Sequence, residues 1–223
     1  MNIVYVDIET IPLPVEEREA FRPTADTVKF GNLKDPVKRV AKVAEAEKAW
    51  EAGGDCALDS MQCEIALIGY AVNDGPFECL SLTESDECTM LREWWQVALL
   101  ADEIVAHNVR FDASKLVQRS WLQGVPVPRK LSEDLMAYRP KIWRDTMLEW
   151  ACGDRQARYT SLKKLCAAFG VTVKDSPVSG EFFYEFFDAQ PNEAIAYNEQ
   201  DVLALQQLWH KMGNVPAEQP RQI

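Results

Sequence analysis

The chain has 223 residues, of which 47% are hydrophobic, so it is long enough to bury a full core within one large domain. Its 24 basic and 35 acidic residues give a formal net charge of −11, which argues against binding nucleic acid or an anionic membrane through overall charge. Local binding of a polyanion stays open, because bound divalent cations can supply positive charge where a phosphate sits.

The cysteines and the N-terminal sequence indicate the compartment. The six cysteines are scattered and form no C-x-x-C pair, so neither a structural zinc site nor a disulfide framework is indicated. The start, MNIVYVDIET, has no basic segment before a long apolar run, and no stretch approaches the ~18 apolar residues of a membrane span. These features predict free thiols in a soluble, intracellular, cytoplasmic protein with no membrane partner.

The first predicted element is a short buried strand over 2–7, which is apolar and β-branched and ends at acidic residues. A polar stretch with several prolines follows over about 12–62, and within it the pattern predicts a helix over 35–52. We interpret the stretch as an insertion in one domain, and not as a second domain.

The rest of the chain has strands early and helices between and after them. Two antiparallel strands joined by a tight turn are predicted over 64–72 and 77–82. The later elements are a helix over 86–100, a strand over 103–106, a helix over 111–122, a short strand or turn near 133–137, and helices over 145–152, 160–169, 180–188 and 191–212. This order favours an α/β fold with helices packed on a sheet. Residues 1–212 are predicted to form a single domain, and 213–223 a loose tail.

Two acids stand directly after the first apolar run. Asp7 and Glu9 are two residues apart, so on an extended strand both side chains point to the same side of the sheet. Most Asp-x-Glu pairs are solvated surface acids, and the pair alone is weak evidence. Its position after Ile-Val-Tyr-Val makes exposure less expected, and two carboxylates on one face repel unless a cation or a proton lies between them.

Two further groups carry acids. Asp112 lies in the first turn of a predicted helix, where the helix dipole already favours an acid, and Asn108 before it also fits a cap or turn residue. Tyr197 and Asp201 are four residues apart in a strong helical pattern, so they share one helix face. Apolar residues near that face would draw Asp201 into partial burial, where it needs a partner.

Such a set of acids suits one kind of chemistry. Hard cations such as Mg²⁺ take oxygen ligands, so three or four carboxylates from separate elements are an expected cage. Two metal ions about 3.5–4 Å apart can activate a water on one side of a phosphodiester and stabilise the leaving oxygen on the other. A tyrosine hydroxyl can orient the water.

The ordered groups Asp7-Ile-Glu9-Thr10, Asn108-x-x-Phe111-Asp112 and Tyr197-x-x-x-Asp201 resemble the three motifs of the DEDD (DnaQ-like) superfamily of 3′–5′ exonucleases. The third group is similar to the tyrosine-type (DEDDy) branch, because Ala196 stands where the histidine-type branch has histidine. Residues 159–170 are also similar to the corresponding region of predicted PolB-like 3′–5′ exonucleases. The resemblance extends from residue 3 to about 209, with a longer insertion after the first motif than the minimal domain carries.

The resemblance implies a ribonuclease-H-like fold, with a central mixed β-sheet flanked by helices. It also implies roles for individual residues: Asp7, Glu9, Asp112 and Asp201 would bind two divalent metal ions, Mg²⁺ or Mn²⁺; Tyr197 would orient the attacking water; and backbone at Ile8 or Thr10, with Asn108 and Phe111, would line the pocket for the 3′-terminal nucleotide. The expected function is hydrolysis of single-stranded DNA from its 3′ end to mononucleotides, with a polymerase or a replication or repair protein as a candidate partner.

A second region has the composition of a nucleic-acid contact. Between Arg129 and Lys164 the basic residues outnumber the acids, and four aromatic residues are interleaved with them: Tyr138, Trp143, Trp150 and Tyr159. Charge combined with stacking is how single strands are bound without reading their sequence. A solvated face with core aromatics accounts for the same pattern, and the sequence leaves both interpretations open.

Three other functions have to be compared with this expectation. The same site could act on RNA, because sugar discrimination depends on how the pocket meets the 2′-hydroxyl group. A non-catalytic nucleic-acid-binding or accessory protein could keep the fold, although all four acids and the tyrosine are present. A hydrolase with a serine or cysteine nucleophile finds no support, since the sequence contains no G-x-S-x-G motif.

Overall fold

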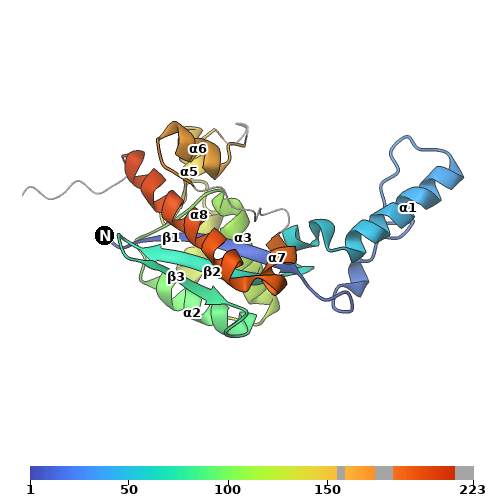
Figure 1. Cartoon of the computed structure of the whole chain (residues 1–223), viewed down its shortest axis with the longest axis horizontal. Coiled ribbons are helices and arrows are strands. Elements are labelled where there is room, and N and C mark those ends of the chain that lie inside the picture. The colour runs from blue at the N-terminus through green and yellow to red at the C-terminus, as the bar shows by residue number, and fades with distance from the viewer. Residues whose placement is uncertain (155–158, 174–182, 214–223) are drawn as a thin grey trace, which may run out of the picture. The chain divides into compact units, whose positions relative to one another are not determined.

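The computed structural model describes residues 1–154, 159–173 and 183–213 (Figure 1). The chain divides into two compact units. The first unit consists of Met1–Glu9 with Ile65–Ile223, and the second consists of Thr10–Glu64. The second unit covers nearly the same residues as the stretch 12–62, whose interpretation as an insertion in one domain stays a prediction. The predicted tail, from residue 214 on, lies outside the described residues.

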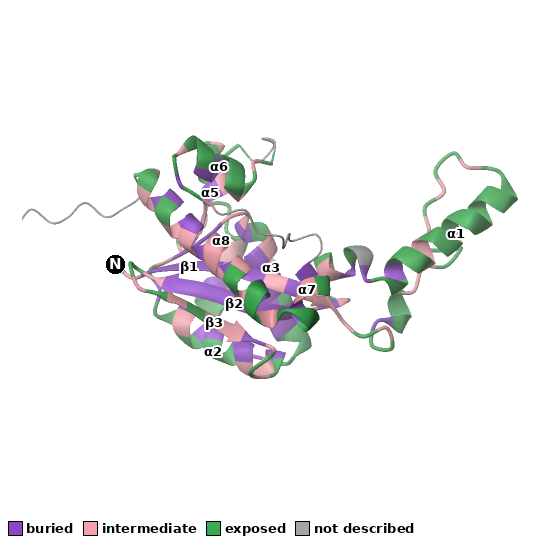
Figure 2. Cartoon of the chain, in the orientation of Figure 1, coloured by how far each residue is buried: buried purple, intermediate pink, exposed green. Residues whose placement is uncertain are grey.

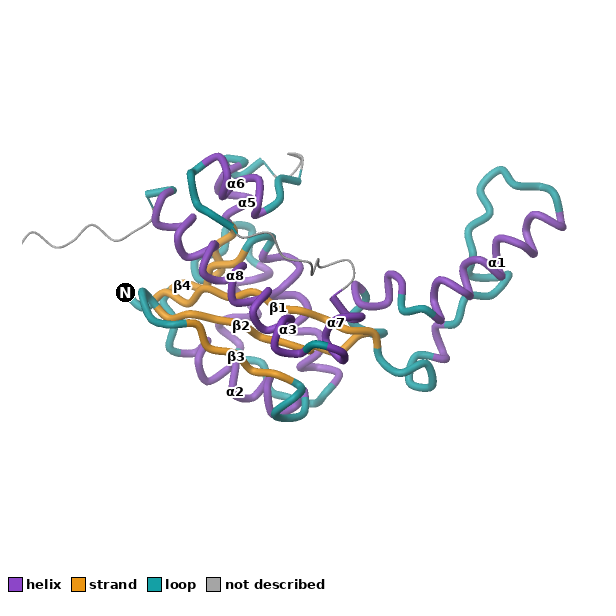
Figure 3. The backbone as a smooth tube through the Cα atoms, viewed as in Figure 1, coloured by secondary structure: helices purple, strands orange, loops and turns teal. Residues whose placement is uncertain are grey.

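A five-stranded sheet forms the centre of the first unit, with the order β3-β2-β1-β4-β5. Figure 3 shows β3, β2, β1 and β4 side by side in this order. Its strands are β1 (Ile3–Pro12), β2 (Cys63–Val72), β3 (Phe77–Ser81), β4 (Glu103–Ala106) and β5 (Trp143–Asp145). Strand β4 pairs in parallel with both β1 and β5, whereas β2 and β3 form an antiparallel pair. The sheet is therefore mixed, and the predicted α/β fold is confirmed in a form that is compatible with a ribonuclease-H-like fold.

Helices of the first unit lie on both faces of this sheet. They are α2 (Glu87–Leu99), α3 (Val109–Leu122), α4 (Arg129–Met136), α5 (Thr146–Trp150), α6 (Leu162–Ala168), α7 (Phe183–Ala189) and α8 (Pro191–Lys211). Alternate residues of β1 decide which helices it meets, because successive side chains on a strand point to opposite faces. Val4 and Val6 join the core cluster that includes Trp94 of α2, while Tyr5 packs in a separate cluster with Leu205 of α8.

A buried ion pair joins α2 to α3. The Arg119 guanidinium donates to both carboxylate oxygens of Glu87, at 2.9 and 2.7 Å, and both side chains are at most 4% exposed. The same carboxylate accepts hydrogen bonds from the Ile65 backbone amide and the Gln123 side chain. These bonds satisfy the oxygens of a buried charge, which would otherwise be costly. The start of α2, one end of β2 and the second half of α3 are thereby held together.

Two sequence predictions need correction, and one strand has no counterpart among the predicted elements. Strand β1 runs to Pro12 and does not end at residue 7, so Asp7 lies inside the strand. The strand or turn predicted near 133–137 is wrong, because helix α4 extends to Met136. Leu131 and Leu135, four residues apart on one helix face, both pack against the core. The three-residue edge strand β5 was not predicted from the sequence.

The second unit is built around Trp50. Helix α1 (Pro36–Glu51) begins at the N-cap Asp35, whose carboxylate accepts two backbone amides, and the predicted helix over 35–52 is confirmed. Two short 3₁₀ helices, Glu19–Phe21 and Gly54–Leu58, complete the unit. The buried Arg18 guanidinium lies 4.5 Å from the Trp50 ring centroid and donates to the Trp50 carbonyl oxygen. Trp50 is the buried residue of α1, and most of the helix is exposed (Figure 2).

Two expectations about the whole chain can be compared with the structure. All six cysteines are free thiols, as expected. In the part of the chain that the structure describes, no helix is long and apolar enough to cross a membrane.

Candidate metal centre

The strand β1 carries two acids on the face that meets α8. Asp7 and Glu9 follow Ile3 and Tyr5 in the same alternation, and Ile3 and Tyr5 pack with α8 residues. The pairing of β1 with β4 covers only Ile3 to Tyr5, so both acids lie where β1 has passed its partner strand. Open space beside a strand at such a point is where α/β sheets place polar ligands.

Helix α8 brings a third acid to the same place. One ligand oxygen each from Asp7, Glu9 and Asp201 lies within 4.8 Å of the other two. All three residues are partly exposed, so the cluster is open to an incoming ion. Three carboxylates at this separation from two elements far apart in sequence are the oxygen donor set that hard divalent cations prefer.

Helix α3 places Asp112 beside this trio without making it a fourth member. Asp112 is 3% exposed, and its Oδ1 accepts a hydrogen bond of 3.2 Å from the Ile8 backbone amide. The helix starts after Asn108, which has the left-handed values φ 65° and ψ 53° that asparagine tolerates. The backbone amide of Asn108 donates to Asp145 Oδ1, and that carboxylate also caps α5. The turn that carries Asp112 is thus fixed from two sides.

Burial and mutual repulsion raise the pKa values of these acids. The pKa of Asp7 lies well above its usual range, first because burial disfavours the carboxylate and then because the other three acids repel it. The pKa of Glu9 is raised in the same way, with Asp201 the strongest neighbouring charge. Burial raises the pKa of Asp112 to about 8 and that of Asp201 to about 6. Repulsion between the carboxylates favours their protonated forms, and a bound cation would relieve this repulsion.

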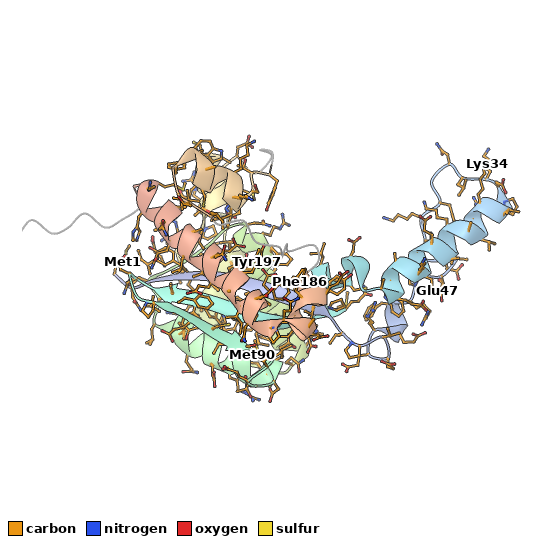
Figure 4. The ribbon with its side chains drawn as sticks, viewed as in Figure 1. Met1, Lys34, Glu47, Met90, Phe186 and Tyr197 are labelled. Atoms are coloured by element: carbon orange, nitrogen blue, oxygen red, sulfur yellow. The ribbon has the colours of Figure 1, made fainter. Side chains whose placement is uncertain are left out.

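Tyr197, labelled in Figure 4, lies one turn before Asp201 on α8, so the two side chains share one face of the helix. Burial raises the pKa of Tyr197 well above its usual value, and the charges of Asp201, Glu9 and Asp7 raise it further. The hydroxyl therefore stays protonated near neutral pH. It can donate a hydrogen bond beside the acids, but it cannot serve there as a base. The Phe183 ring of α7 packs at 6.4 Å from the Tyr197 ring and limits its movement.

Asn198 is a site residue that the sequence reasoning missed. It is fully buried, and its Nδ2 donates to the carboxylate Oδ2 of Asp7 at 2.8 Å and to the Asp7 carbonyl oxygen at 3.2 Å. Its Oδ1 has no hydrogen-bond partner and points at Gly69 of β2, where an added Cβ would lie 1.7 Å away. Gly69 therefore leaves the space that lets Asn198 fix the Asp7 side chain. Nothing but its position beside Tyr197 could have indicated this in the sequence.

The substitution Gly69→Ala tests this packing. A methyl group has to displace the Asn198 amide, so we expect the free energy of unfolding to fall by about 1–3 kcal/mol. The matched variant Gly69→Ala/Asn198→Ala should recover part of that loss, because the clash is removed. Denaturant unfolding of the single and double variants measures the coupling. Strictly additive losses would contradict the contact.

The predicted nucleotide-pocket residues have other contacts in the structure. The Ile8 side chain is buried in the core, and its amide holds Asp112. Thr10 belongs to the second unit, where its hydroxyl donates to the Ala57 carbonyl oxygen at 2.7 Å. Phe111 packs against the core, with the Lys115 ammonium 5.5 Å from its ring centroid. Their role in binding a nucleotide, like that of Asn108, stays a prediction.

The region 129–164 divides between core and surface. Trp143 is a core residue at 3% exposure, whereas Tyr138, Trp150 and Tyr159 are exposed. Arg144 is paired with Glu103 and Glu149. Arg155 and Arg158 lie outside the described residues. The interpretation as a core aromatic therefore holds for Trp143, whereas the three exposed aromatic residues stay compatible with a nucleic-acid contact.

The rings of His107 and Tyr159 pack against each other near the acidic cluster. The two His107 ring nitrogens lie 2.9 Å from the Thr146 hydroxyl and 2.8 Å from the Thr160 carbonyl oxygen, so the ring cannot rotate freely. The Tyr159 ring meets it edge to face, with centroids 6.2 Å apart. Burial raises the pKa of the Tyr159 hydroxyl, and the charges of Asp112, Asp7 and Asp201 add to this shift. An exposed aromatic side chain thus lies within electrostatic reach of the acidic cluster.

Comparison with known proteins gives the fold alone. No family model matches the chain, and no curated protein matches it. Among solved structures, the chain is similar to a family B DNA polymerase from the hyperthermophilic archaeon Pyrobaculum calidifontis, with a TM-score of 0.61 and 16% sequence identity. The similarity covers 95% of this chain and 24% of the polymerase, so the chain spans about a quarter of that protein's length. The α/β arrangement that holds the acids is thus one that a family B DNA polymerase also contains.

Proposed function

We propose that the chain is a metal-dependent 3′–5′ exonuclease of the DEDDy type that removes mononucleotides from single-stranded DNA. The observation that carries this proposal is the convergence of Asp7, Glu9 and Asp201 within 4.8 Å, beside the buried Asp112. Hydrolysis of a phosphodiester needs concentrated positive charge at the phosphate. Acids placed this closely are suited to bind the divalent cations that supply this charge. The similarity of fold to a family B DNA polymerase supports a role in nucleic-acid processing.

The four acids would hold two divalent cations, Mg²⁺ or Mn²⁺, which supply Lewis-acid chemistry at the scissile phosphate when bound. The chain's own side chains position the reactants. Tyr197 keeps its proton and would orient the attacking water by a hydrogen bond, while Asn198 fixes Asp7 in its rotamer. Asp112, held by the Ile8 amide, keeps its carboxylate turned to the strand that carries the other acids. The exposed Tyr159 would offer a ring to the terminal base.

The proposal is tested by incubating 5′-labelled single-stranded DNA and RNA with Mg²⁺ or Mn²⁺. We expect a ladder that shortens from the 3′ end and that is absent both with EDTA and for the variant Asp7→Ala/Glu9→Ala. An equal number of exposed acids changed in the second unit, Asp26→Ala/Glu45→Ala, provides the matched control and should cleave normally. Cleavage that survives EDTA or the loss of both acids would contradict the proposed site.

The two substrates in this experiment also separate the alternatives. Faster shortening of RNA would make the chain an exoribonuclease with the same acids, because only contacts to the 2′-hydroxyl distinguish the two strands. Binding of either strand without cleavage in Mg²⁺ and in Mn²⁺ would identify a non-catalytic accessory protein. No observation in the described part of the chain favours either alternative over DNA hydrolysis.

A further inference from the structure

The second unit carries a concentration of positive charge that the acidic cluster does not use. Residues 29–42, which we call the basic arm, contain one acid and five cations: Lys29, Lys34, Lys38, Arg39 and Lys42. The net charge of +4 over this segment contrasts with −11 for the whole chain. All five cations are exposed (Figure 2), and Figure 4 shows Lys34 next to the start of α1. The acid, Asp35, is engaged as the cap of α1.

The basic arm is folded, and its charges are held at fixed places. Lys42 Nζ donates to the Lys29 carbonyl oxygen at 2.7 Å, which ties α1 to the loop before it. Arg39 Nε donates to the Leu33 carbonyl oxygen, and its guanidinium lies 5.0 Å from the Phe30 ring centroid. Lys38 and Lys42 are one helical turn apart, with a rise of about 6 Å between them. Lys38 and Lys42 therefore share one face of α1, and among the residues that the structure describes none of the five cations takes part in a side-chain ion pair.

The basic arm also carries exposed apolar side chains. Val37 is 77% exposed and Val40 is 71% exposed, although both are residues that usually lie in a core. Exposed cations together with exposed apolar side chains suit a polyanion that also carries flat, weakly polar groups. Single-stranded nucleic acid has this chemistry. An acidic protein would use the valines as its centre, but the five-to-one ratio of cations to acids favours a partner whose charge repeats along its length.

We propose that the basic arm binds the sugar-phosphate backbone of single-stranded nucleic acid. This inference rests on the proposed function for the identity of the ligand, but it concerns a surface of the second unit and not the acids. Contacts to phosphate are independent of sequence, so the arm would raise affinity for any strand without selecting among bases.

The test is binding of a fluorescent single-stranded oligonucleotide, measured by anisotropy between 50 and 200 mM salt. It uses the full chain carrying Asp7→Ala/Glu9→Ala, so that no cleavage disturbs the equilibrium. Each phosphate contact in a single strand contributes about 0.7 to the slope of log K against log salt. We expect Lys34→Gln/Lys38→Gln/Lys42→Gln to reduce the slope by about 2, and Lys34→Gln/Lys38→Gln, which keeps the bond to Lys29, to reduce it by about 1.4.

The matched control for the double variant replaces two exposed cations that lie outside the arm and outside the region 129–164, Lys48→Gln/Arg92→Gln. An unchanged slope for the arm variants would overturn the inference and leave the arm as a surface for an acidic protein. An equal reduction of the slope for the control would also overturn the inference, because binding would then depend on the total charge of the chain and not on the position of the arm. If the unaltered chain cleaves but the arm variants leave the salt slope unchanged, only this inference is contradicted. Salt-dependent binding by the arm without cleavage in the unaltered chain defeats the proposed function alone.

Discussion

Mg²⁺ or Mn²⁺ at about 100 times its dissociation constant is expected to raise the melting temperature at pH 8 by about 5–10 °C, and to raise it much less at pH 5. The reason is competition between protons and cations. The pKa of Asp112 is about 8 and that of Asp201 is about 6, and both are about 3.8 for unperturbed aspartate. At pH 5 these carboxyls hold protons in the folded chain, and a cation would have to displace them.

The same pKa shifts determine whether the free energy of unfolding rises or falls with pH when no metal is bound. Folded pKa values above the unfolded values mean that the folded chain binds more protons between about pH 4 and pH 8. The free energy of unfolding should therefore fall as pH rises through this window, and cations should restore it at the upper end. Thermal unfolding in EDTA and in Mg²⁺ from pH 5 to pH 8 measures both effects. A metal-free melting temperature that rises over this range would contradict the clustered acids.

Two variants separate the cage from general charge effects in this experiment. Asp7→Asn should reduce the metal-induced shift, because it removes a ligand and part of the repulsion. Asp26→Asn, which removes an equally charged but exposed residue of the second unit, should leave the shift unchanged. A melting temperature that does not respond to millimolar metal at pH 8 would count against the cage itself.

Tyr197→Phe is expected to lower kcat by about 10²-fold or more while the metal-induced rise in melting temperature is kept. The hydroxyl stays protonated beside Asp201, so its contribution is a donated hydrogen bond and not a metal ligand. Phenylalanine keeps the ring that packs on Phe183 and removes only that bond. Single-turnover cleavage of a labelled oligonucleotide, with thermal unfolding in parallel, measures the two properties on the same samples.

Asp201→Asn supplies the contrast, since it should reduce both cleavage and the metal-induced shift. The exposed Tyr138→Phe is the matched control and should change neither. The hydroxyl of Tyr197 would be excluded from the reaction if Tyr197→Phe cleaved at the normal rate. If this variant instead lost its response to metal, the tyrosine would be acting through the cage.

Local patterns were sufficient for most of the fold. Alternation along β1 correctly put Asp7 and Glu9 on one side of the sheet, because a strand with a period of two leaves no other arrangement. The hairpin of β2 and β3 was predicted for a similar reason, since a tight turn between two apolar runs defines it. The convergence of Asp201 with these acids could only be inferred from the resemblance of the motifs, because it depends on how α8 crosses the sheet.

The features that the sequence did not predict depend on contacts between distant segments. Helix α4 is held by Asp134, whose carboxylate accepts the backbone amides of 141–143, and a local pattern contains no trace of that contact. Asn198 was missed because its function depends on a glycine 129 positions away, Gly69, that makes room for it. Asp145 was read only as part of a helix, although it also fixes the turn before Asp112.

The buried pair of Glu87 and Arg119 limits how this fold can diverge. Loss of one partner leaves an unpaired buried charge at a cost of about 3–5 kcal/mol, a large share of the stability of an ordinary domain. Both residues therefore have to change together, for example to two apolar side chains of similar volume. Arg119 lies two turns after Asp112 on the same helix, so such a paired exchange would alter the packing of the helix that carries Asp112.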